Sequence, residues 1–158
     1  MGERRGQFVL EAIVRFPKKG KVATLMAWLI LIFILSADSS SGEHSATLLQ
    51  TLLGFFGILP RPGGYDSLHF LLRKLAHFSE YFLLFFLWRW NLKSSFLSLF
   101  LAIAYACTDE LHQAFIPHRT ASPRDVLIDA AGALTAGLVF ESLGRLVSLL
   151  HRQEGSIE

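Results

Sequence analysis

Polar and ionisable side chains interrupt the long apolar runs of this chain, and they do so near matching ends of consecutive runs. An ionisable group at the centre of a bilayer-spanning helix costs about 2.5 kcal/mol or more, so such groups are rare and face other helices. Their repetition at matching ends predicts that three helices contribute to one shared site. The side chains concerned are Lys74, His77 and Glu80 in the second run, Asp109, Glu110, His112 and Gln113 in the third, and Arg124, Asp125 and Asp129 in the fourth.

Four apolar stretches predict membrane-spanning helices, at residues 22–37, 68–90, 94–116 and 123–146. Crossing the hydrocarbon core takes about 20 residues, a length that the last three stretches reach with their charged residues included. The first is shorter and fits where flanking serines cap it or where the bilayer is thinned. Charged residues make up only 18% of the chain, against about a quarter in soluble domains. We therefore expect a single-domain, all-α polytopic membrane protein with four transmembrane helices.

The amino terminus combines a basic segment, residues 1–21, with the first apolar stretch. A cleaved secretory signal has the same layout. Its apolar core would be at the long end of the usual range, and further apolar stretches follow, so the sequence favours an uncleaved signal-anchor. With both termini in the cytoplasm, ten of the fifteen Lys and Arg residues lie on the inner side, as the positive-inside rule requires. Residues 147–158 then form a cytoplasmic tail.

A further apolar segment, residues 46–59, lies between the first two predicted spans. It is too short to cross the hydrocarbon core, and the prolines at 60 and 62 end it sharply. A fifth crossing would also place the carboxyl terminus outside, against the charge rule. We expect a helix that lies in the outer interface or enters the membrane only partway.

The predicted topology brings the polar residues of the last three spans to the outer half of the membrane. Residues three or four apart share a helical face, and the turn before the last span adds Arg119. Basic side chains suit a phosphate or pyrophosphate group, whereas carboxylates and imidazoles suit proton transfer. The residues expected to bind a ligand are Lys74, Gln113, Arg119 and Asp125, and the candidates for acid–base catalysis are His77, Glu80, Asp109 and Glu110.

The same residues allow simpler interpretations. One alternative is that the polar groups have no role beyond linking helices, with each link worth about 0.6 kcal/mol. Two bonded pairs would be enough for that purpose, and this set has about ten members. Pairs such as His77 with Glu80 are workable for a metal ion. No known zinc motif is present, however, and we predict no metal site.

Several functional classes are disfavoured by the sequence. The net charge of +2, without a basic stripe, disfavours nucleic-acid binding. The single cysteine, Cys107, excludes an intramolecular disulfide and zinc sites built from paired cysteines. The Leu and Phe residues of the middle spans are core or lipid contacts and indicate no cofactor. Small residues four apart in the last span, Gly132 with Ala136 and Ala133 with Gly137, favour close packing inside the bundle over homodimerisation.

Three segments carry a resemblance to a known family. They are Arg73–Tyr81 (RKLAHFSEY), Thr108–Phe115 (TDELHQAF), and Pro117-His118-Arg119 with the following Ser122–Asp129 (SPRDVLID) and Gly132. The chain resembles the VanZ family, named for an accessory glycopeptide-resistance protein of bacteria, over roughly residues 36–137. His118 stands where many members have glycine, and Asp129 stands where many have asparagine.

The resemblance implies a multi-pass protein of the bacterial cytoplasmic membrane with a role in the cell envelope and in teicoplanin resistance. The family brings no settled reaction, so no catalytic assignment is carried over. The leading hypothesis is an outer-leaflet pocket that binds or modifies an anionic envelope lipid or lipid-linked precursor, with membrane lipids as partners. The alternative is a non-enzymatic scaffold or partner-binding protein whose polar residues only lock the bundle.

Overall fold

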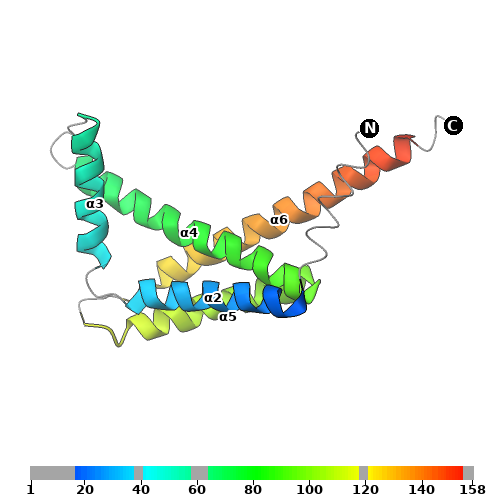
Figure 1. The fold of residues 1–158 in the computed structure, drawn as a ribbon, viewed down its shortest axis with the longest axis horizontal. Helices are drawn as coiled ribbons and strands as arrows, with labels where there is room; N and C mark the ends of the chain where they lie inside the picture. Colours follow the sequence, from blue (N-terminus) through cyan, green and yellow to red (C-terminus); the bar gives the residue numbers. More distant parts are fainter. Residues whose placement is uncertain (1–16, 38–40, 58–63, 118–120, 155–158) are drawn as a thin grey trace.

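The computed structural model describes residues 17–37, 41–57, 64–117 and 121–154, without the side chains of 41–45 and 151–154. This part of the chain is all-helical, as the composition and apolar runs predicted. Figure 1 shows its five helices, which are α2 (Lys18–Ala37), α3 (Ser41–Phe55), α4 (Gly64–Leu92), α5 (Ser95–Gln113) and α6 (Pro123–Glu154).

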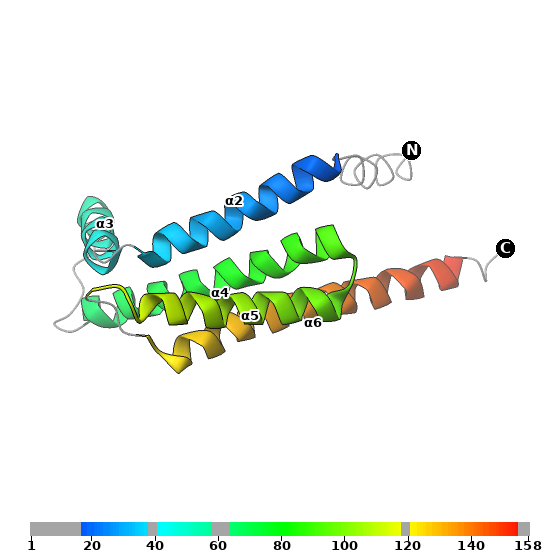
Figure 2. The same cartoon turned by 90° about the horizontal axis from the view of Figure 1, so that it is seen from below.

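The helices α2, α4, α5 and α6 run in alternating directions along one bundle. The carboxyl ends of α2 and α5 and the amino ends of α4 and α6 therefore lie at the same end, and α3 runs crosswise there (Figures 1 and 2). We call this end of the bundle the α3 end. The most extensive packing joins α4 to α6, while α5 packs on both, and α2 packs on α4 and α5 less extensively.

Local sequence explains where several helices begin and end. Ser94 caps α5, and its hydroxyl accepts a hydrogen bond from the backbone N–H of Leu97 at 3.3 Å. Lys93, with a φ of 56°, turns the chain between α4 and α5, and Gly57, with a φ of 66°, lies in the turn that follows α3. Pro123 occupies the first position of α6, where its missing N–H is not needed.

Within the described residues, two helices are long and apolar enough to cross a membrane by length and composition, α2 and residues Pro123–Leu150 of α6. The polar residues that α4 and α5 carry keep both out of this group, although α4 has 29 residues and α5 has 19. The four crossings, and the interfacial position of residues 46–59, therefore stay predictions. The helix predicted at 46–59 begins earlier, at Ser41, and the last helix continues to Glu154, into the segment predicted as a tail.

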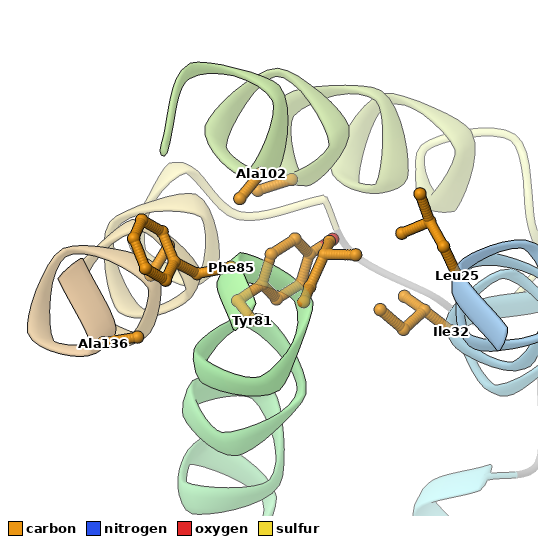
Figure 3. Close-up of a cluster of buried hydrophobic side chains, with 9 residues drawn as sticks. Leu25, Ile32, Tyr81, Phe85, Ala102 and Ala136 are labelled. Carbon is orange, nitrogen blue, oxygen red and sulfur yellow. The ribbon is translucent and has the colours of Figure 1, made fainter. Parts of the chain in front are cut away.

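The hydrophobic core lies where α4 meets the other three bundle helices. Tyr81, Leu84 and Phe85 of α4 are fully buried there. Figure 3 shows Phe85 beside α6, and Leu25 and Ile32 of α2 facing Tyr81 from the other side. Large apolar side chains are meanwhile exposed on every helix of the described chain. A protein in water rarely exposes so much apolar surface, whereas a lipid-facing bundle does.

Glycine sets the separation between α4 and α6. A Cβ atom at Gly132 would overlap the carbonyl oxygen of Phe78 and lie 3.0 Å from its carbonyl carbon. Ala133 and Ala136 are fully buried, and a Cβ atom at Gly137 would lie 3.4 Å from the ring of Phe85. The small-residue face predicted on the last span thus packs inside the bundle.

Candidate functional site

The candidate site is a group of side chains near the α3 end of the bundle, contributed by α4, α5 and α6. We call it the polar cluster. Its members are Lys74, His77, Glu80 and Tyr81 of α4, Asp109, Glu110 and Gln113 of α5, and Asp125 and Asp129 of α6.

The first contact in the cluster joins α4 to the first turn of α6. The Nζ atom of Lys74 forms an ion pair with Oδ1 of Asp125, with side-chain exposures of 23% and 12%. The Lys74 ammonium also lies 5.2 Å from the centre of the Phe70 ring, a cation–π contact. An ammonium group carries three N–H donors, and Asp125 accepts one of them. Lys74 thus holds the start of α6 and retains donors for a further partner.

One turn further along α4, His77 meets Asp129 of α6. Its Nδ1 atom lies 3.3 Å from Oδ1 of Asp129, close enough for an ion pair when the imidazole is protonated. The contact falls short of hydrogen-bond geometry. Nδ1 of His77 and both carboxylate oxygens of Asp129 are therefore without a hydrogen-bond partner among the described residues. Asp129 is fully buried, while 15% of the His77 side chain is exposed. His77 therefore lies between the buried interior of the cluster and its accessible edge.

On α5, Asp109 accepts a hydrogen bond from the Gln113 side-chain amide at 3.2 Å. Both residues are buried. The Ser36 hydroxyl of α2 is close to the Asp109 carboxylate but lacks hydrogen-bond geometry. The other Asp109 oxygen has no hydrogen-bond partner within the described chain. Asp109 therefore has only partial compensation for its burial.

Glu110 has a structural contact of its own. One carboxylate oxygen accepts a hydrogen bond from the backbone N–H of Ser122 at 2.7 Å, just before α6 begins. A carboxylate at the amino end of a helix is also favoured by the helix dipole. Glu110, predicted as an acid–base candidate, thus fixes the start of α6 against α5.

Glu80 and Tyr81 complete the cluster on α4. The Glu80 side chain lies within electrostatic range of Asp109 and Asp129, and the indole N–H of Trp28 on α2 donates to its backbone carbonyl at 3.1 Å. Tyr81 is fully buried, and its hydroxyl has no hydrogen-bond partner in the described part of the protein. It too lies within electrostatic range of the Asp109 and Asp129 carboxylates.

The structure brings together seven of the eight side chains predicted to bind a ligand or move protons. Arg119, the eighth, lies outside the described residues. Arg124 is exposed, and the ring of His112 stacks on Phe33 of α2, with the ring centres 4.3 Å apart. Three helices therefore converge as the matching ends of the apolar runs predicted.

Two members of the cluster are not among the residues predicted to bind a ligand or move protons. Asp129 belongs to the predicted shared site but has no predicted role there, and it is the most buried acid of the described chain. Tyr81 enters the sequence analysis only within a segment of the family resemblance. Its spacing of four residues from His77 was the available signal, because that spacing places both side chains on one face of α4.

A metal site is not visible in the described part of the chain. No three His, Cys, Asp or Glu side chains there come together in a way that could hold a metal ion. What the arrangement provides chemically is a set of buried hydrogen-bond acceptors, one ammonium group and one imidazole.

Comparison with known proteins gives a family assignment. A family model described as VanZ/LLP1 matches residues 21–145, which is most of the chain and includes the whole polar cluster. No curated protein and no solved structure matches.

Proposed function

Because the chain belongs to the VanZ/LLP1 family, we propose that it is a cell-envelope protein whose polar cluster binds or modifies an anionic envelope lipid or lipid-linked precursor. The family and the apolar helices indicate a membrane protein. The proposal adds that it resides in the bacterial cytoplasmic membrane and affects susceptibility to lipoglycopeptides such as teicoplanin.

One observation carries the proposal. Three helices place buried polar groups in one cluster, and several of these groups have no hydrogen-bond partner among the described residues, notably Asp129 and the Tyr81 hydroxyl. A buried polar group without a partner costs about 1–3 kcal/mol. Polar links that serve only to join helices would satisfy one another. Unmet hydrogen-bonding capacity at one end of the bundle is what a ligand-binding site provides. The anionic character of the proposed ligand rests on the Lys74 ammonium group at the accessible edge of the cluster.

The charge distribution supports the predicted orientation. Lys18, Lys19 and Lys21 lie at the amino end of α2, opposite the α3 end, and so do Arg89 and Lys93, near the end of α4. The positive-inside rule assigns such an end to the cytoplasm. The α3 end then faces outward, and the polar cluster lies in the outer leaflet, where envelope lipids and their precursors are exposed.

In this proposal the basic residues hold the anionic group of the ligand. Lys74 has N–H donors beyond the one directed at Asp125. Arg119, which lies between α5 and α6 in the sequence, would add a planar donor set that suits a phosphate group. His77 is half-buried beside this edge and would orient the ligand or move a proton.

A second candidate function follows from the contacts that the cluster does satisfy. The pairs Lys74 with Asp125, Gln113 with Asp109, and the Ser122 N–H with Glu110 each connect or order helices. They favour a non-enzymatic scaffold or partner-binding protein in which the polar cluster is structural. This alternative predicts that neutral substitutions reduce stability without a separate loss of function.

Native mass spectrometry of the full chain in mild detergent tests the proposal. Phosphatidylglycerol and a polyprenyl phosphate are added in turn, and the retained lipid is measured for the native protein, Lys74→Gln and Arg119→Ala. Lys93→Gln, at the other end of the bundle, is the matched control. We expect bound lipid in the native protein and the control, and at least tenfold less in the two variants.

The same variants are then expressed in a teicoplanin-susceptible bacterium. We expect the native chain and Lys93→Gln to raise the inhibitory concentration, and the two site variants to lose this effect at equal protein level. Equal lipid retention in all four proteins, with phenotypes that only follow protein level, would favour the scaffold alternative.

A further inference from the structure

The buried part of the polar cluster contains more acid than base. Asp125 is paired with Lys74, and Glu110 accepts a backbone N–H. The second oxygen of Glu110 has no hydrogen-bond partner among the described residues, and Asp109 and Asp129 likewise lack full compensation. Across the described residues, four carboxylic acids are buried while no lysine or arginine is, and these acids are Asp109, Glu110, Asp125 and Asp129.

Asp109 and Asp129 have too few hydrogen-bond donors in the described chain for their four carboxylate oxygens. Asp109 has one oxygen bonded to Gln113, whereas its second oxygen and both oxygens of Asp129 have no hydrogen-bond partner among the described residues. The imidazole of His77, at 3.3 Å from Asp129, is the one base of the described chain that contacts either carboxylate. A buried carboxylate with few hydrogen-bond donors is destabilising, because water no longer solvates it, and single contacts with His77 and Gln113 compensate Asp129 and Asp109 only in part.

Tyr81 gives an independent indication from a residue that is not an acid. It is fully buried, and its hydroxyl finds no hydrogen-bond partner in the described chain although carboxylates lie within electrostatic range. Buried tyrosine hydroxyls usually have a partner. The Tyr81 hydroxyl and the carboxylates of Asp109 and Asp129 therefore all have oxygen atoms without a hydrogen-bond donor in this part of the protein, and all three groups can accept a hydrogen bond.

The chemistry of these groups identifies the ligand group that fits them. A phosphate offers acceptors and negative charge, so it would be repelled here. A primary ammonium group offers three N–H donors, a positive charge and no acceptor. We propose that the acid side of the polar cluster, Asp109 and Asp129 with Tyr81, binds a primary ammonium group.

This inference rests on the proposed function and makes its ligand zwitterionic, with the phosphate near Lys74 and the ammonium group deeper in the bundle. His77, which contacts Asp129, is three residues from Lys74 on α4, or about 4.5 Å along the helix axis, a spacing of the order of the two-carbon link between phosphate and amine. Exposure falls in the same direction, from 23% for the Lys74 side chain to zero for Tyr81. An amine-bearing phospholipid headgroup has its two charges in this order when it enters from the Lys74 edge.

Access to the acid side requires a helix to move, because Asp129 and Tyr81 are fully buried. The helix that packs least extensively in the bundle is α2. It covers the acid side through Ser36, beside Asp109, and through the Trp28 contact with the Glu80 carbonyl. Outward movement of α2 would expose the acids while α4, α5 and α6 stay packed.

The test compares lipids that differ in the amine alone. The full chain is placed in nanodiscs or mild detergent with phosphatidylethanolamine, with its N-acetylated form, which keeps the phosphate but loses the positive charge, or with phosphatidylglycerol. Retention is read by native mass spectrometry for the native protein, Asp109→Asn, Asp129→Asn and Tyr81→Phe. Asp66→Asn, an exposed acid in the first turn of α4, is the control. Methylammonium alone is added as a competitor.

We expect the native protein and Asp66→Asn to retain phosphatidylethanolamine at least tenfold better than the N-acetylated lipid. The Asp109 and Asp129 variants should lose this preference, and Tyr81→Phe should reduce it several-fold, with helix content by circular dichroism unchanged. If methylammonium displaces the lipid, the ammonium group alone is sufficient for binding. If methylammonium does not compete, the whole lipid headgroup is the ligand.

Equal retention of all three lipids by the native protein would overturn the ammonium site and leave the proposed function standing. Retention of none of them would overturn the ammonium site, and if the polyprenyl phosphate is not retained either, the proposed function is overturned as well. If Asp109→Asn or Asp129→Asn fails to fold, Tyr81→Phe decides, because it removes one hydroxyl and no charge; an unchanged amine preference in that variant would count against the site.

Discussion

Replacing Gly132 by alanine tests the close approach of α6 to the backbone of α4. The added Cβ atom would overlap the carbonyl oxygen of Phe78 and lie 3.0 Å from its carbonyl carbon. Carbon atoms pack favourably at about 3.5–4.0 Å, so α6 has to move away from α4 by roughly 1 Å. The Phe78 carbonyl group is part of the α4 backbone and cannot rotate aside as a side chain would, so the overlap cannot be relieved locally.

The cost follows from the interface that must open. Association of helices in a bilayer depends on van der Waals packing, because lipid is as apolar as the side chains. A gap of 0.5–1 Å forfeits about a quarter to a half of each contact across the interface, and α4 with α6 is the most extensive one. Overpacking typically costs about 1–3 kcal/mol. Alanine regains up to about 1 kcal/mol through helix propensity. Because the obstructing group is backbone in the most extensive interface, the overpacking cost lies at the upper end of its range, about 3 kcal/mol, and we expect Gly132→Ala to lower the free energy of unfolding by about 2 kcal/mol.

Two other glycines of α6 provide matched controls. A Cβ atom at Gly144 would meet no atom within 4 Å, and at Gly137 it would make ordinary contact with the Phe85 ring at 3.4 Å. We expect Gly144→Ala to be neutral or stabilising by up to about 1 kcal/mol and Gly137→Ala to fall between the two. The assay is reversible unfolding in mixed micelles, followed by circular dichroism. If Gly132→Ala is as stable as Gly144→Ala, the close approach of α4 and α6 is wrong.

Three further predictions use other contacts. Glu110→Ala leaves the Ser122 N–H unpaired and should destabilise by about 1–2 kcal/mol. Glu110→Gln keeps an acceptor, so it should cost less and preserve the proposed effect on teicoplanin susceptibility; loss of that effect in a stable Glu110→Gln protein would instead show a chemical role. Tyr65→Phe removes the hydroxyl that donates to the Ala46 carbonyl, so hydrogen exchange of the α3 amides should become at least several-fold faster. Unchanged exchange would show that this hydrogen bond does not hold α3 in place. Phe55 is 82% exposed at the end of α3. If α3 lies in the membrane interface, the fluorescence that Phe55→Trp adds to that of the three native tryptophans should be quenched more by lipids brominated near the headgroup than by lipids brominated deep in the acyl chain.

The helices of this protein are predictable from its sequence because their cause is local. Long apolar runs need hydrogen-bonded backbone in any non-aqueous setting, so they predict helices. Polar residues at matching ends of consecutive runs predict one cluster, because antiparallel neighbours bring alternate ends together. The predicted small-residue face of the last span was correct for the same reason, since spacing alone places Gly132 and Ala136 on one side.

The partners within the cluster depend on how the helices are rotated and how far apart they lie, and sequence spacing does not contain that information. The backbone contact between Gly132 and Phe78 sets the separation of α4 and α6. At that separation, Asp125 forms an ion pair with Lys74, and Asp129 contacts His77. Glu110, an acid–base candidate by sequence, instead orders the start of α6, and Tyr81 emerges as a buried hydroxyl without a partner in the described chain. The sequence by itself determined which residues are polar and at which end of each helix they lie. Only the packing of the helices decided which of them compensate one another, because compensation of buried charge depends on distances of a few ångströms between residues far apart in the chain.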